Sequence, residues 1–78
     1  MWEVHYSLEA ANYLADNSAL ISELYWAMEC LADTDGMPSS GEYRELCGLV
    51  YWTIQDHEVV YRRAEPEQTI RVLLIRPD

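Results

Sequence analysis

The sequence contains no lysine, and its first 43 residues contain no arginine either. Those residues carry eight acids, whereas residues 44–78 carry six acids and all five arginines, so the formal net charge of −9 is concentrated in the first part of the chain. A protein that grips nucleic acid gains affinity by neutralising phosphates with Lys and Arg. The composition therefore argues against direct nucleic-acid binding. It leaves two interpretations, an acidic surface that keeps the protein soluble or a surface for a basic partner.

Long apolar runs and cysteine pairs are also scarce. No run approaches the length of a membrane span and no basic-then-apolar start suggests a signal peptide, so we expect a cytoplasmic protein without membrane contact. Cys30 and Cys47 stand seventeen positions apart, which favours free buried thiols over a disulfide or a metal site. Their spacing from His5 and His57 gives no support to a zinc site. We therefore expect no metal and no cofactor.

The most specific stretch is residues 50–61, which is rich in β-branched and aromatic residues and predicts two strands of a hairpin. A two-residue turn at Gln55 and Asp56 would place Trp52 opposite Val59. Side chains alternate across a strand, and a slip by one residue would move Glu58 onto the apolar face, so the pattern fixes the pairing. One face of the hairpin is then core, formed by Val50, Trp52, Ile54, Val59 and Tyr61.

The residues before the hairpin predict a strand and two helices. Residues 2–6 alternate, with Trp2, Val4 and Tyr6 inward. Ser7 is a good N-cap for a helix, and Ser18 is one for a second helix. The predicted apolar positions of the first helix are Leu8, Ala11, Leu14 and Ala15, and those of the second are Leu20, Ile21, Leu24, Met28 and Leu31, with Tyr25 and Trp26 at its flanks.

The remaining segments complete the predicted fold. Residues 33–41 form a loop, residues 42–46 a short turn of helix or an irregular connection, and residues 69–75 a last strand that Pro77 ends. The order is β-α-α-β-β-β. We therefore predict a single α+β domain, residues 1–78, in which a two-helix hairpin packs on one face of a four-stranded, largely antiparallel sheet.

This order resembles the RelE/ParE superfamily of toxins from bacterial type II toxin–antitoxin systems. Residues 4–14 (VHYSLEAANYL) match the first strand and the "eA…yL" helix of these toxins, and residues 27–31 (AMECL) match the end of their second helix. Residues 50–61 line up without gaps on a family hairpin that reads approximately Y-R-I-R-V-G-D-Y-R-V-V-Y. Residues 70–75 fall on the family's final strand. The resemblance covers essentially the whole chain.

The departures from the family concern its chemistry. In its ribosome-dependent endoribonucleases, basic residues on the open sheet face hold the RNA, but those positions are Tyr51, Thr53 and Glu58 here. The family's terminal histidine-arginine pair is replaced by Pro77 and Asp78, and no catalytic C-terminal segment is matched. Phosphodiester cleavage needs a base, an acid and cationic charge on the phosphate. The resemblance therefore implies a toxin fold whose ribonuclease activity is lost, with no catalytic residues.

The second face of the hairpin is the predicted binding surface. Tyr51, Val60 and the neighbouring Leu73 would be partly exposed there unless the loop of residues 33–41 folds over them. Arg62 either pairs with Glu58 or stays available to a partner. His57 is expected to be a turn histidine without a catalytic role, and Trp26 a core or half-buried anchor. The predicted binding residues are Tyr51, Thr53, Glu58, Val60, Arg62 and Arg44.

Three functions follow from these patterns. The first is an interaction protein whose partner is an antitoxin-like protein or a second copy of the chain; the resemblance also suggests DNA gyrase or the ribosome. The second is a divergent messenger-RNA endoribonuclease that uses Glu58, His57, Arg62 and Arg44. The third is a decoy or homodimer whose acidic helical layer engages a basic protein.

Overall fold

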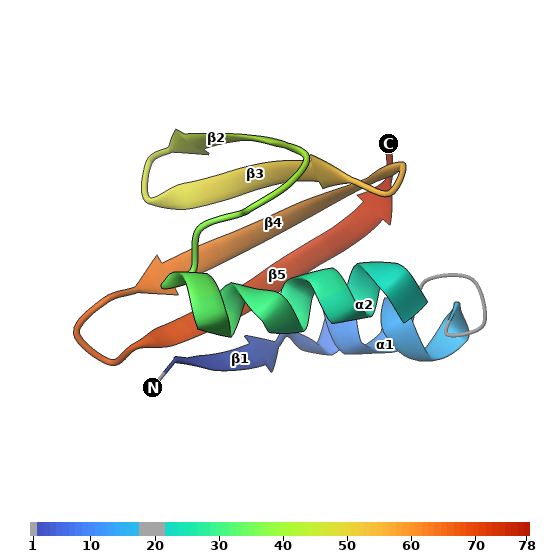
Figure 1. Cartoon of the computed structure of the whole chain (residues 1–78). Helices are drawn as coiled ribbons and strands as arrows, with labels where there is room; N and C mark the ends of the chain where they lie inside the picture. The colour runs from blue at the N-terminus through green and yellow to red at the C-terminus, as the bar shows by residue number, and fades with distance from the viewer. Residues whose placement is uncertain (1, 18–21) are drawn as a thin grey trace.

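A computed structural model of the chain describes residues 2–17 and 22–78. Two helices pack against a five-stranded mixed sheet with the strand order β1-β5-β4-β3-β2 (Figure 1). The predicted α+β class with two helices is confirmed. The predicted number of four strands is wrong, because a fifth strand is present. Three of the four strand pairings are antiparallel, and β1 runs parallel to β5. The elements are β1 (Glu3–Tyr6), α1 (Leu8–Asp16), α2 (Ser22–Glu29), the 3₁₀ helix η1 (Cys30–Thr34), β2 (Glu42–Leu46), β3 (Leu49–Ile54), β4 (His57–Ala64) and β5 (Thr69–Pro77).

The additional strand is β2, in the segment for which a helical turn or an irregular connection was predicted. It pairs antiparallel with β3 through a two-residue turn at Cys47 and Gly48, whose φ values are 53° and 81°. All five of its residues are exposed, because it is a sheet edge with no helix over it (Figure 1). Short, charged edge strands lack the apolar alternation that marks a half-buried strand. This explains why the sequence pattern did not predict it.

The β3–β4 hairpin has the predicted register. Ile54 pairs with His57, and Trp52 pairs with Val59. Gln55 and Asp56 form the turn, with φ values of 53° and 60°, the left-handed conformation at both positions that a type I′ turn requires. All five residues predicted for the core face are buried: Val50, Trp52, Ile54, Val59 and Tyr61.

The ladder between β4 and β5 contains one irregularity. Val60 pairs with Leu74 but Tyr61 pairs with Val72, so Leu73 is an extra residue, a β-bulge, on β5. The Leu73 carbonyl accepts a hydrogen bond from Ser7 Oγ at 2.7 Å. Ser7 Oγ also accepts from the Ala10 amide at 3.1 Å, which confirms Ser7 as the N-cap of α1. One hydroxyl therefore joins the start of the helix to the bulge.

The buried face of α1 differs from the predicted one, whereas that of α2 agrees with the prediction. Leu8 is 78% exposed and Ala10 is fully buried, with Tyr13 and Leu14 packed against the core, so the predicted α1 face was rotated. Leu24, Met28 and Leu31 are buried as predicted. Trp26 is 69% exposed, so the prediction that it is a core or half-buried anchor is wrong. The remaining predictions for this region, Ser18, Leu20 and Ile21, lie outside the described residues.

The segment after η1 packs on the helix-facing side of the sheet. Trp52 Nε1 donates to the Ser40 carbonyl at 2.8 Å, and the Tyr61 hydroxyl donates to the Gly36 carbonyl at 2.7 Å. Gly41 has a φ of 74°, and a Cβ at this position would lie 2.5 Å from the Thr53 carbonyl oxygen. The segment therefore closes the core around Trp52 and does not fold over the other face of the sheet.

Replacing Trp52 with alanine should lower the free energy of unfolding by about 3–5 kcal/mol, because the side chain is 1% exposed and its removal leaves a cavity. Urea denaturation followed by circular dichroism measures this change. Trp26→Ala is the matched control, expected to stay within about 0.5 kcal/mol because that indole is exposed. Equal losses in both variants would contradict the placement of the core.

Candidate functional site

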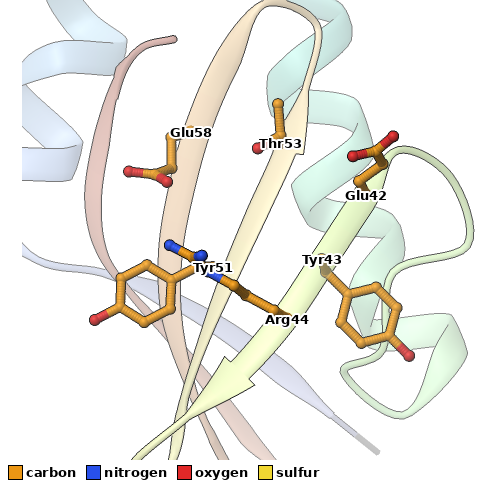
Figure 2. Close-up of a pocket in the computed structure, with 6 residues that line it drawn as sticks. All are labelled: Glu42, Tyr43, Arg44, Tyr51, Thr53 and Glu58. Atoms are coloured by element: carbon orange, nitrogen blue, oxygen red, sulfur yellow. The ribbon is translucent and has the colours of Figure 1, made fainter.

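The open face of the sheet contains a shallow hollow of about 290 Å³ over β2, β3 and β4. Figure 2 views this face, with the helices behind the sheet. Four of the six predicted binding residues line the hollow: Arg44, Tyr51, Thr53 and Glu58. They meet there because their strands are in register, with Arg44 opposite Tyr51 and Thr53 opposite Glu58. The complete lining is Glu42, Tyr43, Arg44, Tyr51, Thr53 and Glu58.

Arg44 and Tyr51 form the centre of this hollow. The Arg44 side chain reaches across β3, and its guanidinium carbon lies 5.5 Å from the centroid of the Tyr51 ring (Figure 2). A guanidinium at this distance from an aromatic ring makes a cation–π contact. The stacked pair presents a flat surface with both aromatic and cationic character, which suits protein contacts.

Glu58 pairs with Arg76 and not with Arg62, which corrects one of the two predicted alternatives. Arg76 lies opposite Glu58 on β5, and its Nε donates to Glu58 Oε1 at 2.7 Å, with Nη2 contacting the same oxygen. The Glu58 side chain is 17% exposed and that of Arg76 is 57% exposed. The carboxylate is therefore held by a neighbouring strand.

Val60 and Arg62 do not belong to this hollow. Val60 is only 7% exposed, because Tyr51 on β3 and Leu74 on β5 lie on either side of it in register. Its prediction as a partly exposed binding residue is therefore wrong. Arg62 is exposed and lines a second hollow of about 350 Å³ at the β4–β5 side of the same face, together with Arg71.

The residues of the endoribonuclease interpretation are divided between the two faces. His57 lies opposite Ile54 on the helix-facing side, whereas its neighbour Glu58 is on the open face. His57 Nε2 is 2.9 Å from the Tyr13 hydroxyl, and Nδ1 is 2.7 Å from the Gln55 carbonyl oxygen. Both ring nitrogens are thus used to join the β3–β4 turn to α1. This structural role accords with the turn histidine that the sequence predicted.

Four of the five arginines lie on the open face, and Arg76 is the one that the sequence pattern did not place there. Simple alternation along β5 would place Arg71 and Arg76, five positions apart, on opposite faces. The bulge at Leu73 adds one residue between them and brings both to the open face, opposite Arg62 and Glu58. A bulge has no reliable sequence signature here, since Leu73 is simply one more apolar residue of the strand. The open-face arginines are Arg44, Arg62, Arg71 and Arg76.

The two tyrosines whose pKa is clearly raised, Tyr6 and Tyr61, lie on the helix-facing side. Burial raises the pKa of the Tyr6 hydroxyl, and its hydrogen bond to Glu29 raises it further. Burial likewise raises the pKa of Tyr61, whose hydroxyl is bonded to Gly36. Both groups therefore stay protonated and serve as hydrogen-bond donors within the core.

Other site predictions concern cysteines, metals and membranes. Cys30 and Cys47 are both free, but Cys47 is exposed at the β2–β3 turn, so its predicted burial is wrong. Within residues 2–17 and 22–78, no three His, Cys, Asp or Glu side chains are grouped so that they could hold a metal ion. None of the described helices has the length and apolar character needed to cross a membrane.

A scan against models of protein families finds no match, and comparisons with curated proteins and with solved structures find no significant match either.

A double-mutant cycle with Glu58→Gln and Arg76→Gln should give a coupling free energy of about 0.2–1 kcal/mol at low salt, the usual range for an exposed ion pair. Urea denaturation at two salt concentrations measures it, with less coupling expected at high salt. The same cycle with Arg62→Gln in place of Arg76→Gln should give a smaller value. Stronger coupling to Arg62 would contradict the observed pairing.

Proposed function

We propose that this chain is a toxin-fold protein of a type II toxin–antitoxin system, of the RelE/ParE kind, that acts by binding another protein after loss of ribonuclease activity. The observation that carries the binding role is the uncovered sheet face, on which the contact between Arg44 and Tyr51 lies one row from the exposed Leu46. The toxin–antitoxin setting is supported by the resemblance in residues 4–14 and 50–61.

The surface has the mixed composition of a protein interface. Leu46 is 56% exposed at the edge of the sheet and pairs with the half-buried Leu49 on the open face, one row from Tyr51. Interface centres are enriched in Tyr and Arg, because these side chains give large contact areas. The edge strand β2 adds backbone N–H and C=O groups that point away from β3 and could pair with an extended segment.

The proposed partner is an antitoxin-like protein, with a second copy of this chain as the other occupant of the same face. DNA gyrase and the ribosome enter only through the family resemblance. Direct nucleic-acid binding is not part of the proposal, because the chain carries fourteen acids against five arginines.

A divergent messenger-RNA endoribonuclease is the second candidate, and one observation favours it. Arg76 contacts Glu58, and Arg44 lies in the same hollow, so a carboxylate and two cations share the open face. Against it, His57 lies on the opposite face and is held by Tyr13 and Gln55. The Glu58 carboxylate is also already paired, which weakens it as a general base.

Purified protein should leave both free and ribosome-bound messenger RNA intact, because His57, the candidate general acid, lies on the opposite face of the sheet from Glu58. A translation reaction followed by primer extension measures cleavage. Glu58→Gln and Arg76→Gln serve as paired controls. Cleavage by the wild type that is lost in either variant would favour the endoribonuclease.

Tyr51→Ala combined with Leu46→Ser should abolish partner capture or self-association by the wild type, since it removes the exposed apolar part of the open face. Val60 is left unchanged because it is buried. The measurements are copurification of the tagged chain from its host and light scattering of the purified protein.

The matched control is Leu8→Ser with Trp26→Ala, an aliphatic and an aromatic residue exposed on the helical layer. This control should retain binding. A wild type that is monomeric and captures nothing, or a control that loses binding as the open-face variant does, would overturn the proposal.

A further inference from the structure

Two arginines of the open face lie directly opposite one another. Arg62 on β4 pairs in register with Arg71 on β5, and both are exposed. Within the described ranges 2–17 and 22–78, neither side chain makes an ion pair or a hydrogen bond. Like charges placed directly opposite across two strands repel each other. This pair is therefore an unfavourable arrangement for the isolated chain.

The absence of a partner stands out against the composition. The chain has fourteen acids and five arginines, so most arginines have an acid available to them. Arg63 contacts Glu65 at 3.0 Å and Arg76 contacts Glu58, while Arg44 is stacked on Tyr51. In the described part of the chain, the two cations without any such contact are the two that face each other.

The surroundings of the pair define what it can bind. Arg62 and Arg71 line a hollow with Ala64, Glu67 and Thr69. On β3, Leu49 lies opposite Arg62, and Leu46 on β2 lies opposite Leu49, so the row continues from two guanidinium groups to two leucines. A guanidinium presents a planar fork of donors that matches a carboxylate. The row thus offers an anion site beside an apolar one.

We infer that Arg62 and Arg71 form a carboxylate-binding site that anchors an acidic side chain of a partner protein, in a segment whose neighbouring apolar residues cover Leu46 and Leu49. This inference rests on the proposed binding function and names the chemistry of the partner. The bound carboxylate relieves the repulsion between the two guanidinium groups.

An acidic peptide segment fits this row better than a nucleic acid does. Glu67 lines the same hollow, and Glu3 lies opposite Thr69, one row away from Arg71. A continuous chain of phosphates crossing the face would pass close to both carboxylates. A single carboxylate between apolar residues meets the two arginines and then the leucines on the side away from Glu3, so Glu67 is the only one of these two acids that it approaches.

Selection from a display library of random dodecapeptides, with the full chain as bait, tests this inference. Selected peptides should contain Asp or Glu next to apolar residues. Fluorescence anisotropy with a labelled selected peptide should show binding about tenfold weaker to the Arg62→Gln, Arg71→Gln variant, because charge-assisted contacts are lost. The wild type should also bind more weakly as salt is raised, and the variant should respond less.

The matched control is Ala11→Glu with Asn12→Asp, which changes the net charge by the same amount at exposed positions of α1. It should bind within about twofold of the wild type, since long-range charge effects are screened. Equal weakening in the control would show that net charge, not the arginine pair, determines binding, and would overturn the inference.

Three further results would overturn it. One is selection of neutral or basic peptides, or of none. The second is binding of a single-stranded RNA oligonucleotide that depends on Arg62 and Arg71, and the third is self-association that depends on them. A peptide could also lose binding to the Tyr51→Ala, Leu46→Ser variant but keep binding to the Arg62→Gln, Arg71→Gln variant. That result would contradict the carboxylate site and would leave the proposed function intact.

Discussion

The two-residue turn at Gln55 and Asp56 is the constraint on which both faces of the sheet depend. With both residues at positive φ, the turn fixes the register of β3 and β4, so Trp52 faces the helices and Tyr51 faces away. A slip of one residue would exchange the two sets of side chains. The His57 ring strengthens this arrangement, because it ties the turn to Tyr13 on α1. The hydrophobic core and the open-face surface are therefore consequences of one local geometry.

The bulge at Leu73 is the second determinant, since it decides which charges share a face. It sets Arg71 and Arg76 on the same side as Arg44 and Arg62. Ser7 holds the bulge by donating to the Leu73 carbonyl while it caps α1. The start of the helical layer and the placement of the open-face cations are thus coupled through one side chain, and a change at Ser7 would affect both.

Strong local patterns made part of this structure predictable. The hairpin of residues 50–61, the Ser7 cap and the buried positions Leu24 and Met28 follow from alternation, capping chemistry and helical spacing. The edge strand β2 was missed because an exposed, charged strand has no apolar signal. The α1 stripe was rotated because alanine and leucine occur on several sides of this short helix, and tertiary packing selects Ala10 over Leu8. Tyr51, Thr53 and Glu58 were predicted correctly for the open face because the register of β3 and β4 places them there. Val60 was wrong because the neighbouring strands bury it, and Arg76 was missed because the bulge brings it to this face.

Net charge is a poor guide to the local charge of this protein, because most arginines and many of the acids lie on different layers. The helical layer carries acids such as Glu9, Asp16 and Glu23, whereas most arginines project from the opposite side of the sheet. Stacked layers lie roughly 10 Å apart, and the screening length at physiological salt is about 8 Å. A group that approaches the open face therefore meets Arg62 and Arg71 more strongly than the distant acids. The composition favours a basic partner for the helical layer, but the local geometry favours an acidic one for the open face. Because a contact at the surface involves one face at a time, the local charge of that face, and not the net charge, determines which groups it attracts.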